Sequence, residues 1–248
     1  MSILWEKYSG DTDYQVRQAG RSLRLYTNGV LHSQYNPNRP VTGSVWDLLW
    51  LPAFFYPKDR LQRILVLGVG GGAVIRHLHD FIQPEQIVGV ELNKVHLSIA
   101  RRFFQVKGRA IQLHHADAVN WVKRYNGPPF DLIIDDLFGD YDGEPQRSVT
   151  ADSAWVNCMS TMLAEEGLIV SNFATRLELE VSAYLLSTCC RKQFASAFAL
   201  STAQNYNAVG VFIRRRVTTR QMRARLKTIP LLDPGKSTGA RYKIRTLY

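Results

Sequence analysis

Residues 63–91 constrain the fold of this chain more than any other stretch of its sequence. An apolar, β-branched run at residues 64–67 leads into four closely spaced glycines, and a helical pattern follows. A second apolar run, residues 87–90, ends in Glu91. This order is typical of the βαβ unit of nucleotide-binding α/β domains. The four glycines are Gly68, Gly70, Gly71 and Gly72.

The glycines allow backbone amides to approach a ligand closely at a helix N-terminus, and Glu91 is placed to accept hydrogen bonds from a ribose diol. Strand and helix patterns then alternate to residue 213, which indicates a doubly wound sheet of seven strands with a terminal hairpin. Strands are predicted near 63–67, 86–91, 110–114, 130–135, 167–172, 195–200 and 208–213. Helices are predicted near 72–82, 93–106, 118–125, 151–164 and 177–192.

Two flanking regions bracket this α/β domain, which is assigned residues 41–213. Residues 1–40 are predicted to form a small β region, with Asn28-Gly29 as a strong hairpin signal. The sequence at residues 44–47 predicts a capping box that begins a helix running to about Phe55. Residues 214–248 form a basic C-terminal extension.

The net charge of +10 resides in that extension. Residues 214–248 contain 11 Lys or Arg and a single acid, Asp233, whereas acids and bases balance over residues 1–213. A solvated terminal helix and strand explain this charge, and so does a surface for nucleic acid or another acidic partner. Nucleic acid is not favoured, because no aromatic interleaving or RNA-binding motif accompanies the charge.

The composition bears on the cellular compartment of the protein and on whether it has a metal site. No apolar run reaches the roughly 18 residues that a membrane span needs, and the N-terminus lacks a signal-peptide layout. Three cysteines form neither a disulfide framework nor a zinc-binding spacing. We therefore expect a cytoplasmic protein without a metal site or a membrane partner.

The glycine turn alone fits two adenosine cofactors, because residues 68–73 also match the NAD pattern G-x-G-x-x-A. Three features favour S-adenosylmethionine or a relative. Asp117 follows the third predicted strand, where such folds bind the adenine amine, although an N-cap explains this acid equally well. Asp135 and Asp136 end the fourth strand, beside the expected ligand crevice. The third feature is the terminal hairpin.

These residues resemble the polyamine aminopropyltransferases (spermidine synthases) and their spermidine synthase-like relatives. The resemblance implies a Rossmann-like, seven-stranded methyltransferase fold after a small N-terminal β region. Residues 68–73 match the family's G-G-G-D-G-G loop, and residues 130–136 match its Y-D-x-I-x-x-D segment. It implies that the S-adenosyl ligand is held by Gly68, Gly70, Gly71, Gly72, Glu91, Asp117, Ala118 and Asp136.

The sequence also departs from the family pattern. Gly71 replaces the loop Asp that holds the amine of decarboxylated S-adenosylmethionine. The second Asp of the family's D-S-S-D falls on Gly139, and Asp140 lies one position late. In the N-terminal part, the family motif D-G-x-x-Q is not kept at residues 28–32, and the family motif Y-H-E is not kept at residues 45–47. Asp136 and Asp140 are the candidate catalytic residues.

Between residues 131 and 144 the chain has six acids and no base: Asp131, Asp135, Asp136, Asp140, Asp142 and Glu144. Such a segment attracts a cationic small-molecule acceptor, although a solvated loop explains its outer half equally well. We expect a transferase that leans to methyl transfer, because Gly71 leaves room for the amino-acid end of intact S-adenosylmethionine. Aminopropyl transfer is the close alternative. The third alternative is a non-catalytic protein that binds an adenosine ligand and has a nucleic-acid-binding tail. The fourth is an NAD-dependent enzyme. The sequence is compatible with a homodimer and does not decide the oligomeric state.

Overall fold

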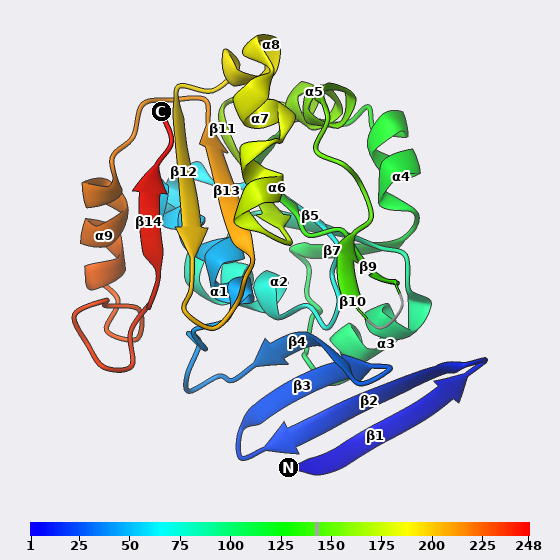
Figure 1. The fold of residues 1–248 in the computed structure, drawn as a ribbon. Coiled ribbons are helices and arrows are strands. Elements are labelled where there is room, and N and C mark those ends of the chain that lie inside the picture. The colour runs from blue at the N-terminus through cyan, green and yellow to red at the C-terminus, as the bar shows by residue number, and fades with distance from the viewer. Residues whose placement is uncertain (142–143) are drawn as a thin grey trace.

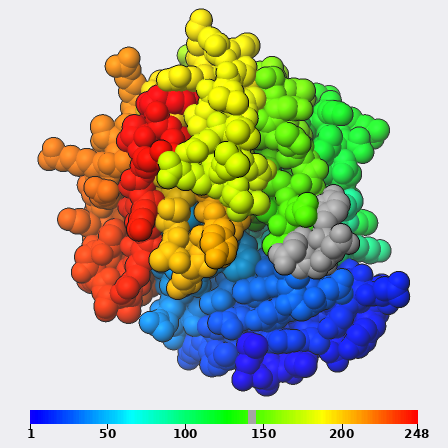
Figure 2. Space-filling model, viewed as in Figure 1, coloured from blue at the N-terminus to red at the C-terminus, as the bar shows by residue number. Residues whose placement is uncertain are grey.

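The computed structural model describes residues 1–141 and 144–248. A four-stranded antiparallel sheet forms the N-terminal layer and lies beneath the body of the molecule (Figures 1 and 2). Asn28 and Gly29 both have positive φ, as a two-residue hairpin turn requires, which confirms the predicted hairpin. The strands are β1 (Ser2–Ser9), β2 (Thr12–Ala19), β3 (Ser22–Thr27) and β4 (Val30–Tyr35).

The main sheet has eight strands in the order β14-β12-β13-β11-β8-β5-β6-β7. Strands β7, β6, β5, β8 and β11 are parallel, and β13 runs antiparallel between β11 and β12. The seven predicted strands are confirmed, and the C-terminal extension supplies an eighth. They are β5 (Arg63–Leu67), β6 (Gln86–Glu91), β7 (Ile111–His115), β8 (Phe130–Asp135), β11 (Leu163–Phe173), β12 (Ser196–Ser201), β13 (Ala208–Ile213) and β14 (Lys243–Thr246).

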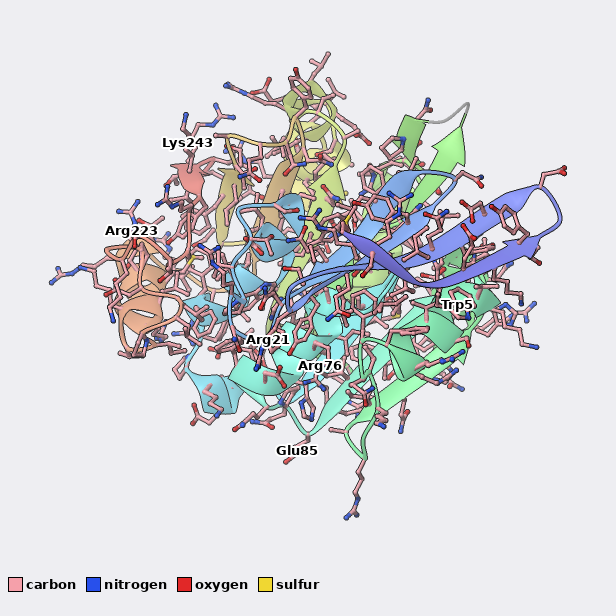
Figure 3. All side chains as sticks on the ribbon, turned by 90° about the horizontal axis from the view of Figure 1, so that it is seen from below. Trp5, Arg21, Arg76, Glu85, Arg223 and Lys243 are labelled. Carbon is pink, nitrogen blue, oxygen red and sulfur yellow. The ribbon has the colours of Figure 1, made fainter. Side chains whose placement is uncertain are left out.

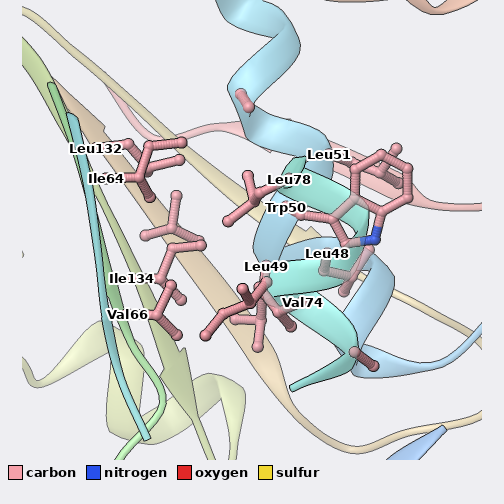
Figure 4. Packing of buried hydrophobic residues seen from close by; sticks show 14 of the residues in the cluster. Leu48, Leu49, Trp50, Leu51, Ile64, Val66, Val74, Leu78, Leu132 and Ile134 are labelled. Carbon is pink, nitrogen blue, oxygen red and sulfur yellow. The ribbon is translucent and has the colours of Figure 1, made fainter. Parts of the chain in front are cut away.

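Alternate residues of the central strands feed two separate hydrophobic cores, as the period of two in a strand dictates. Figure 4 shows the first core, in which Leu49, Val74 and Leu78 face Ile64 and Ile134 of the sheet. Helical elements on this side are α1 (Val45–Trp50), the 3-10 helix η1 (Leu51–Phe55), α2 (Ala73–His77), the π-helical turn η3 (Leu78–Ile82), α3 (Lys94–Arg102) and α9 (Thr219–Lys227). A short 3-10 turn, η2 (Lys58–Arg60), precedes β5.

The second core lies on the opposite face of the sheet, where Leu65, Ile133 and Phe212 point. Its helices are α4 (Ala118–Arg124), α5 (Ser153–Thr161), α6 (Arg176–Glu180), α7 (Ala183–Leu186) and α8 (Thr188–Arg191). The single helix predicted over 177–192 is wrong. New N-caps at Ser182 and Ser187 divide this stretch into short helices.

The helix predicted to begin at Ser44 does begin there, but the capping box is wrong in detail. Ser44 makes no side-chain cap, and Asp47 instead accepts hydrogen bonds from the amides of Thr42 and Gly43 at 2.8 and 2.6 Å. Burial raises the pKa of Asp47 to about 6 despite these bonds. Within the described residues, no helix is long and apolar enough to cross a membrane.

The C-terminal extension is built into the fold through its own side chains. Met222 and Leu226 of α9 are fully buried, and Arg225 donates to the carbonyls of Phe54 and Phe55. Arg214 donates to three carbonyls near the end of α5 and the start of β11. Bases of the extension that have hydrogen-bond or ion-pair partners in the described structure include Arg214, Arg215, Arg225, Arg241 and Arg245.

Candidate functional site

The glycine turn lies between β5 and α2, where the chain must pass very close to β8. Gly68 has a φ of 84°, and a Cβ there would lie 2.1 Å from the carbonyl oxygen of Asp136. A side chain at this position is therefore excluded both by conformation and by space. The carboxyl ends of β5 and β8 lie side by side at this turn, at the edge where open α/β sheets bind ligands.

Glu91 ends β6 and organises this turn. One carboxylate oxygen accepts hydrogen bonds from the amides of Val69 and Gly70, both at 2.9 Å, and the other accepts from Asn93 at 2.8 Å. Its side chain is buried. Because each carboxylate oxygen has two acceptor sites, the group keeps capacity for a ribose hydroxyl. Its role toward a ribose stays a prediction.

The N-terminal sheet covers the other side of the turn. The Ser33 hydroxyl accepts from the Ala73 amide at 3.3 Å, and the His32 carbonyl oxygen lies 3.0 Å from where a Gly70 Cβ would stand. A Cβ on Gly71 would lie 2.7 Å from Ser33 Cβ. The expectation that Gly71 leaves room for the amino-acid end of a ligand is therefore wrong, because Ser33 of β4 and Phe104 fill that space.

Asp117 is the N-cap of α4, since its carboxylate accepts from the Asn120 amide at 2.8 Å. It also lies in an open groove of about 550 Å³ between the edge strand β7 and α4, together with Trp121 and Tyr125. Ala118 is buried under the first turn of α4. The structure confirms the N-cap interpretation of Asp117, and its contact with adenine stays a prediction.

Asp135 ends β8 and is completely buried in an ion pair with Arg147 at 2.9 Å. The Trp155 indole also donates to it, at 3.2 Å. Arg147 is 3% exposed and ends β10 (Glu144–Arg147), which pairs with β9 (Phe138–Tyr141) as a small hairpin after β8. Burial alone would lower the pKa of Arg147, but Asp135 and Glu178 raise it, so the guanidinium stays charged.

Asp136 follows directly and has a different environment. Asn172 of β11 donates to its carboxylate at 2.8 Å, and Asn207 donates to the Asn172 side-chain oxygen at 3.1 Å. Arg147 fixes the Asn172 backbone through its carbonyl at 2.5 Å. Burial raises the pKa of Asp136 to about 6, the Asn172 bond opposes this increase, and Asp135 adds to it. A carboxyl group that titrates near neutrality suits a general base.

The structure divides the six acids of the segment 131–144. Asp131 starts β8 and accepts from the amides of Gln62 and Arg63, far along the strand from the glycine turn. The position of Asp131 is the expected one, near the start of the strand and away from the site. Asp135 is paired with Arg147, so the expectation of a uniformly acidic, cation-attracting segment is wrong for Asp135. Asp140 lies in β9, but its side chain, like that of Glu144, is outside the described part, and Asp142 lies outside the described residues. The catalytic role of Asp140 stays a prediction.

Sequence reasoning missed Arg147, Asn172 and Asn207. Arg147 lies just beyond the segment that drew attention, and only the hairpin β9–β10 brings it back to Asp135. A buried strand that ends in Ser-Asn was the available signal for Asn172, because the carboxyl end of β11 must lie beside that of β8.

The fold and the glycine turn define a Rossmann-like α/β domain of the methyltransferase type, preceded by a small β-sheet. The family model described as the spermine/spermidine synthase domain matches residues 47–215. The chain therefore belongs to the spermine/spermidine synthase family, as its motifs predicted.

Named relatives agree with this membership. A polyamine aminopropyltransferase 2 from Caldanaerobacter subterraneus is 30% identical over 107 residues, which cover 42% of this chain and 35% of the relative. A polyamine aminopropyltransferase from Chromobacterium violaceum is 26% identical over 129 residues, which cover 51% of this chain and 45% of the relative. The matched stretch thus spans less than half the length of each. Both relatives are named for aminopropyl transfer, whereas methyl transfer is the reaction that we expected from the sequence.

Solved structures share the fold. A probable spermidine synthase from Corynebacterium glutamicum superposes with a TM-score of 0.71 at 16% identity, covering 99% of this chain and 91% of that one. Human methyltransferase-like protein 13 in complex with SAH gives 0.60 at 18% identity, covering 73% and 88%. These likenesses confirm the predicted Rossmann-like architecture with its N-terminal β region.

Proposed function

We propose that this protein transfers an aminopropyl group from decarboxylated S-adenosylmethionine to a small amine. Family membership and the names of the matched relatives support this reaction. The argument for methyl transfer rested on free space at Gly71, and Ser33 fills that space. The observation that carries the proposal is the position of the Asp136 carboxyl beside the glycine turn, where burial raises its pKa to about 6.

The residues around the turn fit a nucleoside. Positive φ at Gly68, Gly70 and Gly72 directs the backbone into a tight turn that no side chain obstructs. Glu91, at the end of β6, is assigned to the ribose, and Asp117 with Ala118 to the adenine. When bound, the decarboxylated cofactor supplies a sulfonium-activated carbon, whose C–S bond breaks as the acceptor nitrogen forms a C–N bond and 5′-methylthioadenosine leaves.

The chain itself must then orient the acceptor and remove one proton from its nitrogen. We assign proton removal to the Asp136 carboxylate. With a pKa of about 6 this group is largely ionised at neutral pH, yet basic enough to accept a proton. Its negative charge also suits a cationic amine before transfer. Asn172 holds one carboxylate oxygen, and the other has no assigned hydrogen bond among the described residues.

Calorimetry and product analysis test this function. We expect decarboxylated S-adenosylmethionine to bind more tightly than either S-adenosylmethionine or NAD. With putrescine as acceptor, mass spectrometry should detect spermidine and 5′-methylthioadenosine. S-adenosylhomocysteine formed from intact S-adenosylmethionine would instead restore methyl transfer. Binding of the ligand with no turnover of any amine would indicate the non-catalytic alternative.

A further inference from the structure

The C-terminal extension has a basic surface that the fold does not use. Within the described part of the chain, Lys236, Arg241 and Lys243 take part in no ion pair, and all three are exposed. Arg223 on α9 and Lys243 at the start of β14 lie on the same side of the molecule, opposite the N-terminal strand that carries Trp5 (Figure 3). These two bases of the extension therefore lie on one side of the molecule.

These three bases line one open groove of about 590 Å³, which we call the basic groove. Its walls are the loop 234–242 with the first residue of β14, and the beginning of the β12–β13 turn at Thr202 and Ala203. Among the described residues, no acid lines it. Asp233, the single acid of the extension, is occupied by the turn, where it accepts from the Gly235 amide at 2.9 Å.

Three cations and the hydroxyls of Thr202 and Ser237 form a lining suited to phosphate oxygens. Arg241 donates to the Ser237 carbonyl at 2.9 Å, but none of the three cations has a carboxylate partner among the described residues, so a ligand of opposite charge would complement the groove. A single phosphate would need fewer contacts than three cations and two hydroxyls provide. The lining therefore favours a chain of phosphates.

An exposed aromatic side chain belongs to the hairpin turn that forms one wall of the basic groove. Tyr206 is 96% exposed and belongs to the same turn as Thr202 and Ala203. Three Cα–Cα steps separate it from Ala203, so its Cα lies within about 11 Å of the wall. This tyrosine comes from the preceding hairpin and not from the basic extension, whose own tyrosines, Tyr242 and Tyr248, are partly buried. A cationic groove with an aromatic platform is typical of single-strand binding.

We propose that the basic groove binds single-stranded nucleic acid, with Lys236, Arg241 and Lys243 on successive phosphates and Tyr206 stacked on a base. This site is separate from the glycine turn, so it does not depend on the proposed function. A duplex lacks the free base faces that Tyr206 needs, which gives the strand preference. The contacts carry no base-specific readout, so we expect binding without sequence preference.

Fluorescence anisotropy of the full chain with labelled oligo(dT) and oligo(U) tests the proposal. Three phosphate contacts predict that log Kd changes with log salt with a slope of about 2, or about a 20-fold loss of affinity between about 50 and 200 mM salt. A matched duplex should bind more weakly. Failure to bind either oligonucleotide at the lower salt would overturn the proposal.

Two sets of variants locate the contact. Lys236→Gln with Lys243→Gln should lower the salt slope by about 1.4. The control, Lys107→Gln with Lys123→Gln, neutralises two exposed lysines of the body and should leave the slope unchanged. Tyr206→Ala should weaken oligonucleotide binding about fivefold to a hundredfold.

Each contrary result overturns a defined part. Equal slopes for the two lysine pairs would mean that the charge of the whole surface, and not the groove, binds the strand. Equal affinity for the duplex, or an unchanged Tyr206→Ala, would remove the single-strand assignment and leave a polyanion surface. Lys236 and Lys243 are remote from the glycine turn. The variant that carries both substitutions should therefore bind S-adenosyl ligands with the same affinity as the unmodified chain.

Discussion

Asn172→Ala should change the protonation of Asp136 without removing the carboxyl itself. The Asn172 amide donates to the ionised form, so its loss raises the pKa of Asp136 above about 6. A hydrogen bond to a charged group contributes about 1.5–3 kcal/mol, which corresponds to an increase of about 1–2 pH units. The ionised fraction at pH 7 then falls from about 90% to between about 50% and 10%.

The assay is the pH profile of kcat/KM for aminopropyl transfer. The acid limb should move upward by about 1–2 pH units, and activity should return toward that of the unmodified enzyme at high pH. This recovery separates an effect on protonation from damage to the fold. Asn207→Ala is the matched control, since it removes a donor to Asn172 but none to Asp136, and its acid limb should move less.

Asn172 is buried, so thermal unfolding must first show that the variant is folded at the assay temperature. A folded Asn172→Ala with an unchanged acid limb would refute the reasoning. Asp136 would then not be the group that titrates in the profile. A loss of activity that is equal at every pH would also refute it, because it would indicate a role in geometry alone.

Three further variants probe the site. Glu91→Ala should weaken S-adenosyl ligand binding about tenfold to a hundredfold by calorimetry, and a normal affinity would exclude Glu91 from the ribose contact. Arg147→Met should lower the free energy of unfolding in urea by about 3–5 kcal/mol, because it leaves Asp135 buried without its partner, and the double variant with Asp135→Leu should recover part of the loss. Burial raises the pKa of Asp136 from 3.8 to about 6. The folded protein therefore has its full stability with respect to this group below about pH 4, where the carboxyl is protonated, and loses free energy of unfolding as the pH rises through about 6. Asp136→Asn should therefore abolish transfer yet stabilise the fold by up to about 3 kcal/mol at pH 8, with no gain at pH 4, in paired urea titrations.

Local patterns predicted the elements that surround the glycine turn. Hydrophobic periodicity located β5 and β6 to within one residue of their observed bounds, because both are buried strands with clear glycine and acid boundaries. For the extension the same reasoning offered a solvated terminal helix and strand without bounds. It did not place β14 in the main sheet, because the four residues of this strand include two bases and carry no alternating apolar signal. Its pairing with β12 depends on the whole sheet being present.

Side-chain contacts between distant segments could not be predicted. From the local sequence, Gly71 only lacks the side chain of the Asp that the family motif has at this position. In the structure, Ser33 from a different sheet fills the space beside it. Asp135 seemed one acid among several until the hairpin returned Arg147 to it. In both cases tertiary packing determines the partner, and no periodicity or spacing in the local sequence indicates which residue that partner is.

The packing of β4 on the glycine turn connects ligand affinity to the N-terminal sheet. Ser33 bonds the Ala73 amide, and Thr27 of β3 bonds His96, which lies 3.9 Å from Glu91. Any ligand held by the turn therefore binds best when this sheet is docked, and by thermodynamic reciprocity it must stabilise the docked sheet by the same free energy. Amide hydrogen exchange in β3 and β4 should slow on ligand binding, so the N-terminal layer would report occupancy of a pocket formed by a different sheet.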